Sequence, residues 1–235
     1  MTVGLKLESP CALPDVLRVR LKPHHRLFQK FEYLDDVLKN ICVCAIAEEL
    51  SAHLQGQPIH AYHCTKEPFS GFFETRGLRL TDVAAHQKEF LDFFGSTFTS
   101  DETEEMRTAW HHHFVEGRQL SNRNGLVWLC ISRPLVKSQG AAVFFKFMGG
   151  ESIFKPLTKH PTIASKLQSL GRAVVVEAVI SGGEIKYPHG LAKYVLSVYH
   201  SSINPDAFVY QAESCIRVPV LPSAIVCVTP SHQFN

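Results

Sequence analysis

The second half of the chain constrains the fold most, because five separate segments there have the composition of β-strands. They are rich in Val, Ile, Phe and Tyr, which favour a pleated sheet, and short polar or helical stretches separate them. The sequence before them instead carries apolar residues at helical spacing. Helices followed by strands predict an α+β protein with mainly antiparallel pairing. We expect the five strands at 125–132, 141–148, 172–181, 207–220 and 224–228.

Local patterns predict the remaining elements. Apolar and basic residues alternate in DVLRVRL, which indicates a strand at 15–21, and the apolar run PIHAYHCT indicates another at 58–65. Gly77 is interpreted as a turn or a helix stop. Ser100 is expected to be the N-cap of the helix that it opens, with acidic residues in the first turn. Helices are expected at 31–54, 85–95, 100–117, 161–170 and 189–200.

Composition and charge set limits on the class of protein. The chain has 235 residues, of which 45% are apolar and 20% charged, so it can bury a substantial core. Its net charge of +2 does not demand a nucleic-acid partner. The first 30 residues nevertheless hold six Lys or Arg against Glu8 and Asp15. Such a segment can follow a phosphate backbone, and a solvated basic surface explains it equally well.

The cysteines and the N-terminus predict a compartment. The seven cysteines form no C-x-x-C pair and most lie in apolar runs, as expected of buried thiols in a reducing environment. The N-terminus lacks the apolar core of a signal peptide, and no apolar run reaches the length of a membrane span. We expect a cytoplasmic protein that does not contact a membrane.

No metal or nucleotide motif stands out. The three histidines of WHHHF would diverge by roughly 100° each on a helix, so they could not share an ion, and no metal is expected. The P-loop, G-x-G-x-x-G, G-x-S-x-G and H-E-x-x-H patterns are missing from the sequence.

Two short stretches carry polar residues at strand spacing. In YQAES, Gln211 and Glu213 would share one face of a strand with apolar neighbours. A carboxylate held there can bond a sugar hydroxyl and stabilise a developing cation, and the exposed polar face of an edge strand explains the pattern as well. In AYHCTK, His63 and Thr65 would also share a face, toward solvent, a core or a ligand.

A third stretch, FFKFMGGES, combines aromatic residues with a glycine pair. Two glycines permit either a close approach of the backbone to a ligand or a tight turn. Glu151 and Ser152 would open the following helix and could cap it. Phe145 and Phe147 could form a stacking surface for a ligand or part of the core.

The order of these stretches resembles the ADP-ribosyltransferase family, whose members use NAD and include diphtheria-toxin-like and bacterial defence enzymes. The shared order is an early His-x-Thr followed by GLRL, a polar turn in the middle, and a late Gln-x-Glu followed by IRVPVLPSAIVCV. The resemblance covers roughly residues 58–230. It implies a catalytic domain at 58–235 with a split, mostly antiparallel sheet. Residues 1–57 would then be an N-terminal extension, a basic strand and helix packed on that core.

The resemblance also implies roles for four polar residues. Glu213 would match the catalytic carboxylate, and Gln211, two residues earlier, would help to select the acceptor. His63 would bond a ribose hydroxyl of NAD. Thr65 would support the strand or touch the cofactor.

The middle stretch departs from the family pattern. Members with a His-type first motif carry a tyrosine pair that stacks on nicotinamide, and this chain has none there. Phe145 or Phe147 would supply the ring instead. Glu151 or Ser152 would touch NAD or support Glu213.

The function implied is NAD-dependent ADP-ribosyl transfer by a toxin or phage-defence effector. Gln211, the basic N-terminal segment, and Arg and aromatic residues that could stack on bases point to a nucleic-acid acceptor, RNA or single-stranded DNA. Expected partners are NAD, a neutralising antitoxin and, in some systems of this kind, a chaperone. The alternatives are modification of a protein, hydrolysis of NAD, and a non-catalytic module that binds nucleic acid or protein.

Overall fold

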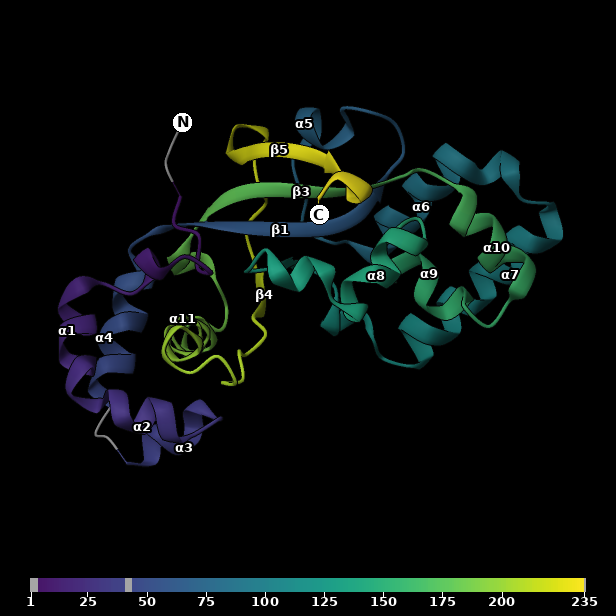
Figure 1. The fold of residues 1–235 in the computed structure, drawn as a ribbon. Coiled ribbons are helices and arrows are strands. Elements are labelled where there is room, and N and C mark those ends of the chain that lie inside the picture. The colour runs from purple at the N-terminus through teal and green to yellow at the C-terminus, as the bar shows by residue number, and fades with distance from the viewer. Residues whose placement is uncertain (1–3, 41–43, 235) are drawn as a thin grey trace. The chain divides into compact units, whose positions relative to one another are not determined.

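The computed structural model describes residues 4–40 and 44–234. Its strands form one five-stranded sheet in the order β4-β2-β1-β3-β5, and β1, β3 and β5 run side by side in Figure 1. The observed pairs β1–β2 and β3–β5 are antiparallel. The α+β class is therefore confirmed. The strands are β1 Pro58–Glu67, β2 Val127–Cys130, β3 Arg172–Ser181, β4 Glu213–Ile216 and β5 Ile225–Pro230.

Helices account for most of the other regular structure. Figure 1 labels those that the text uses below. None of the helices among residues 4–40 and 44–234 is both long enough and apolar enough to span a membrane. The α-helices are α1 Asp15–Leu21, α2 His25–Lys30, α3 Leu34–Lys39, α4 Cys44–Gln55, α5 Phe72–Arg76, α6 Val83–Phe94, α7 Ser100–His111, α8 Gln139–Lys146, α9 Glu151–Leu157, α10 Pro161–Ser169 and α11 Pro188–Ile203.

The chain divides into two compact units that alternate along the sequence. Unit 1 comprises residues 1–62, 128–135 and 179–216, and unit 2 comprises the remainder. Strands β1 and β3 each contribute residues to both units. The proposed catalytic domain at 58–235 stays a prediction.

Unit 1 is built around the contact between α4 and α11. Ile46, Leu50 and Leu54 repeat every four residues on α4 and are buried, which gives the helix one apolar face. The backbone after β3 approaches α4 closely, since a Cβ on Gly182 would lie 1.9 Å from the Leu54 carbonyl oxygen. Only glycine fits at that approach.

Unit 2 has a separate apolar core formed mainly by helices α6, α7, α9 and α10. Trp110 of α7 is buried in it, and its indole N–H donates to the carbonyl of Ile153 on α9 at 3.0 Å. Helix α7 begins with a capping box in which Thr99, not the predicted Ser100, is the N-cap, and Glu102 is its partner. On the sheet, Val176 of β3 pairs with Val228 of β5.

Two segments predicted as strands are helices. Residues 15–21 form α1, because Leu17 and Leu21, one helical turn apart, are the buried residues. Residues 141–148 fall largely in α8, which Ser138 caps by accepting a bond from the Ala141 N–H at 3.1 Å.

Other predictions differ in length. The helix predicted at 31–54 is broken into α3 and α4, and its residues Ile41 and Cys42 lie outside the described part of the chain. The strand predicted at 207–220 shortens to the four residues of β4. Gly77 does end a helix, as predicted, since it follows α5 with a φ of 69°.

Candidate functional site

Strand β1 places the first two predicted site residues in unit 2. His63 is half buried and its ring meets the edge of Phe73, with 6.5 Å between the centroids. Thr65, two residues further along the strand, is buried. His63 is therefore the more accessible of the two.

Ser152 meets a histidine that the sequence did not single out. Gly149 and Gly150 both have positive φ and turn the chain into α9. Ser152, in the first turn of that helix, is 5% exposed, and its Oγ lies 2.6 Å from Nδ1 of His86 on α6. Its Oγ is also 3.4 Å from the Gly149 carbonyl oxygen. The much shorter distance identifies His86 as the main partner of Ser152.

The environment of His86 favours the neutral form of its imidazole. Burial lowers the pKa of His86 most, and the positive charge of Arg79 and the nearby His63 lower it further, against the opposing effect of Glu89. A neutral imidazole has one N–H donor and one acceptor nitrogen, so Nδ1 can accept a hydrogen bond from the Ser152 hydroxyl. Ser152 is thus bonded directly to His86, and His63 acts on His86 through its charge.

Glu151 occupies the first position of α9 and pairs with two cations. Its carboxylate forms an ion pair with Arg123 and lies 3.6 Å from Lys155 on the next turn. The text below uses the name His86–Ser152 cluster for four residues of unit 2, His63, His86, Glu151 and Ser152.

The two predicted aromatic rings differ in their availability. Phe147 is buried in the core of unit 2 and stacks on Phe154, with centroids 5.3 Å apart and planes tilted by 23°. Phe145, on α8, is half buried. Of the two, Phe145 remains the candidate for stacking on a ligand.

The predicted catalytic pair belongs to unit 1. Glu213 is the first residue of β4, and both it and Gln211 are exposed, whereas Ser214 is buried. The backbone beside them is fixed, since Ala212 O accepts a bond from the Ile131 N–H at 2.9 Å. The predicted site residues thus fall into two groups, one in each unit.

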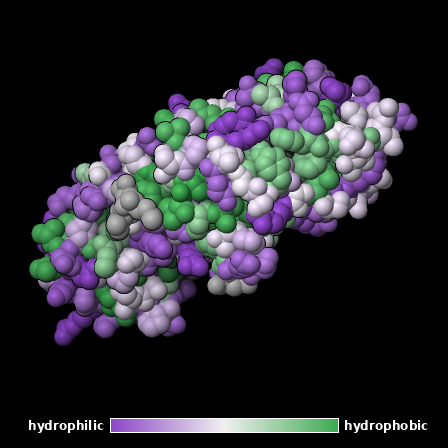
Figure 2. Space-filling model, turned by 90° about the horizontal axis from the view of Figure 1, so that it is seen from above, coloured by the Kyte–Doolittle hydropathy of each residue, from purple (hydrophilic) through white to green (hydrophobic). Residues whose placement is uncertain are grey.

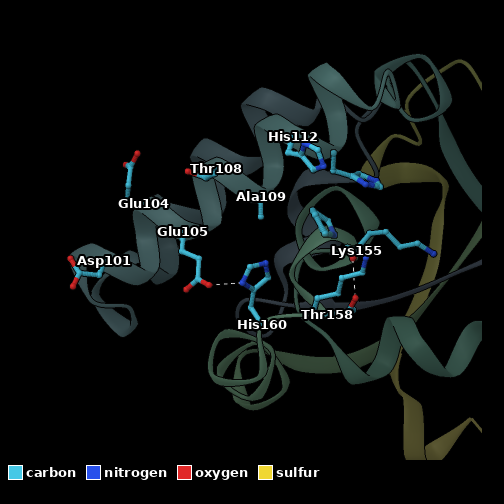
Figure 3. Close-up of a pocket in the computed structure, with 12 residues that line it drawn as sticks. Asp101, Glu104, Glu105, Thr108, Ala109, His112, Lys155, Thr158 and His160 are labelled. Carbon is cyan, nitrogen blue, oxygen red and sulfur yellow. Dashed lines mark hydrogen bonds and ion pairs between the residues drawn. The ribbon is translucent and has the colours of Figure 1, made fainter.

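Unit 2 also carries a groove between α7 and the segment 155–160. Its volume is about 830 Å³, within the usual range for small-molecule sites. Figure 3 shows Glu105 of α7 pointing toward His160, and its carboxylate lies 2.5 Å from Nδ1 of that histidine. Lys155, the partner of Glu151, also lines the groove.

Two histidines of WHHHF line the same groove. His112 bonds Glu116 at 2.7 Å. The pKa of His113 is lowered, first by burial and then by the positive charges of Lys155 and Arg123. Among the residues that the structure describes, no group of three or more His, Cys, Asp or Glu is placed to hold a metal ion.

No pattern in the sequence pointed to His86 or to the groove. His86 lies on an ordinary amphipathic helix. The groove is lined by the polar face of α7, and a polar helix face usually indicates only a solvated surface. Searches against protein-family models, curated proteins and solved structures found no match to this chain.

Proposed function

We propose that the protein is an NAD-dependent ADP-ribosyltransferase whose cofactor contacts include the His86–Ser152 cluster. One observation supports the proposal: Ser152, which the family resemblance assigns to NAD or to the support of Glu213, is hydrogen-bonded to His86, and the charge of His63, assigned to NAD, also lowers the pKa of His86.

The cluster has suitable chemistry for a ribose or a phosphate. Imidazole N–H groups and a serine hydroxyl donate hydrogen bonds, and neutral rings can also accept them from ribose hydroxyls. Glu151 adds a carboxylate whose charge Arg123 and Lys155 balance. In the proposed enzyme these groups bind and orient part of the dinucleotide.

Glu213 is the proposed catalytic residue. The bond between nicotinamide and ribose C1′ breaks, nicotinamide leaves with the bonding electrons, and a cation develops at C1′. A carboxylate stabilises that cation, as in glycoside cleavage. The acceptor then forms a bond to C1′ and loses a proton to solvent or a nearby base.

Replacing Glu213 by Gln is expected to reduce turnover at least a hundredfold, because the developing positive charge loses its counter-charge. The measurement is release of nicotinamide and transfer of label from NAD labelled in its adenosine part. RNA, single-stranded DNA and cell lysate serve as acceptors in turn. Glu184→Gln, which neutralises another exposed carboxylate of unit 1, is the matched control.

The possible outcomes separate the alternatives. Nicotinamide release without transfer would indicate an NAD hydrolase, and label on protein would indicate a protein-modifying enzyme. The exposed side chain of Glu213 favours the remaining alternative, a non-catalytic binding module. Failure of the wild-type protein to consume NAD with any acceptor would overturn the enzyme and favour that alternative.

A further inference from the structure

Unit 2 exposes two large aromatic side chains close together. Phe69 is 50% exposed and Phe93 is 38% exposed, and their ring centroids lie 6.1 Å apart. Phe72 is buried beneath them and meets both rings edge-on, at 5.4 and 6.1 Å. Figure 2, the view from above, shows groups of hydrophobic residues among hydrophilic ones on the molecule's surface. The rings are therefore supported from below and open to solvent.

Two arginines accompany these rings. The Arg76 guanidinium lies over Phe72, 4.8 Å from the ring centroid, and 5.8 Å from that of Phe93. Arg76 and Arg79 both form ion pairs with the carboxylate of Glu89, and the Arg76 guanidinium lies 2.7 Å from that carboxylate. One acid between two guanidiniums leaves a net positive charge, and each guanidinium has five N–H donors. We call Phe69, Phe72, Arg76, Arg79 and Phe93 the aromatic–arginine patch.

Ring contacts inside unit 2 link the patch to His63 of the His86–Ser152 cluster. The ring centroids of Phe72 and Phe73 lie 5.1 Å apart, and those of Phe73 and His63 lie 6.5 Å apart. The charges of Glu89 and Arg79 also act on His86. A ligand on the patch would thus lie two ring contacts from His63.

We propose that the aromatic–arginine patch binds a single-stranded nucleic acid, with bases stacked on Phe69 and Phe93 and phosphates paired with Arg76 and Arg79. Aromatic faces beside guanidiniums match the alternating bases and phosphates of a single strand. A duplex hides its base faces, so it fits the patch poorly. The inference rests on the proposed function in one respect: the bound strand would be the ADP-ribose acceptor.

Stacking is tested by fluorescence anisotropy with a labelled 20-nucleotide single-stranded RNA and DNA, in the absence of NAD. Phe69→Ala is expected to weaken binding about tenfold, the usual effect of removing one stacking ring. Phe69→Tyr keeps an aromatic face and is expected to bind like the wild type, whereas Phe69→Leu keeps only apolar surface and should bind weakly. Phe208→Ala, which removes an aromatic side chain 47% exposed on unit 1, is the matched control.

Phosphate pairing is tested by the salt dependence of the same binding. Arg79→Gln is expected to lower the slope of log K against log salt by about 0.7, the value for one phosphate contact on a single strand. Arg107→Gln removes the same charge from an exposed position on α7 and should leave the slope unchanged.

Four results would overturn the inference: no binding of single strands at low salt, a duplex bound as tightly as a single strand, unchanged ADP-ribose transfer by Phe69→Ala, or Phe69→Leu binding like the wild type. The last result would indicate an apolar protein partner. Because binding is measured without NAD, single-strand binding that depends on Phe69 supports the patch even if NAD is never consumed. If the protein consumes NAD and Phe69→Ala transfers as much ADP-ribose as the wild type, only the role of the patch is overturned.

Discussion

At the scale of single residues, the most informative side chain is His86. Its Nδ1 lies 2.6 Å from Ser152 Oγ, and burial holds its pKa below the ordinary value. The unfolded chain therefore takes up a proton at a higher pH than the folded protein does. The free energy of unfolding should fall as the pH drops through about 6.5, the ordinary pKa of histidine.

Replacing His86 by Asn is expected to flatten this dependence, because Asn does not titrate. At about pH 7.5 the variant should also lose about 1 kcal/mol, since its bond to Ser152 is less well placed. Urea unfolding at about pH 7.5 and about pH 5.5 measures both effects. The pKa of His113 is also lowered, so the unfolding free energy of the His86→Asn variant should still depend on pH to some extent.

The control for this experiment is His53→Asn, at an exposed position on α4. An unchanged difference in unfolding free energy between the two pH values in His86→Asn would contradict the assignment of the effect to His86.

The site residues show what residue patterns can and cannot reveal. Spacing on a strand drew attention to His63, and a glycine pair drew attention to Ser152, but nothing in the sequence links either of them to His86. The link depends on the packing of α6 against α9, which brings residues 66 positions apart to within hydrogen-bond distance. Tertiary contacts of this kind leave no local pattern.

At the scale of elements, glycine geometry makes a sharp prediction. Gly77, with φ of 69°, follows α5, and a Cβ there would lie 2.1 Å from the carbonyl oxygen of Val220. The neighbouring Leu78 pairs with Val220 through two backbone bonds of 2.8 Å. Gly77→Ala should therefore lower the free energy of unfolding by roughly 3 kcal/mol, from backbone strain and a displaced carbonyl.

Gly190→Ala on α11 is the matched control for that variant. A Cβ at Gly190 would meet no atom within 4 Å, so alanine should raise the free energy of unfolding by roughly 0.5–1 kcal/mol. Chemical denaturation of both variants gives the comparison. Equal effects of the two substitutions would show that the close approach to Val220 is absent.

Most elements followed from local pattern. The β-branched run RAVVVEAVIS is β3 over its whole predicted range, and helices α6, α7, α10 and α11 lie within a few residues of their predicted positions. One wrong prediction came from a segment whose residues fit both a strand and a helix periodicity. In DVLRVRL the strand alternation competes with the helical spacing of Leu17 and Leu21, and the apolar contacts of those two leucines decided the outcome.

At the scale of the whole molecule, the cysteines provide a test of burial across both units. Cys11 and Cys227 are exposed, whereas Cys64 and Cys215 are buried. We expect iodoacetamide to modify the first two in the native protein and the last two only in denaturant, with mass spectrometry locating the adducts. Modification of Cys215 as fast as Cys11 under native conditions would contradict the structure.

The division into units also shows where sequence reasoning ends. The family resemblance placed a domain boundary at residue 57, and that boundary stays a prediction. The compact units of the structure group residues that the chain visits in alternation. Such grouping depends on which distant segments pack together. Only the three-dimensional arrangement contains that information.

The pairing of α4 with α11 has a consequence for synthesis in the cell. From the end of α4 at Gln55 to the start of α11 at Pro188, the ribosome must add roughly 130 residues, at about 5–20 residues per second. For on the order of ten seconds, the side chains of Ile46, Leu50 and Leu54 lack the helix that covers them in the finished fold. During that interval the nascent chain presents an apolar helix face of the kind that chaperones hold.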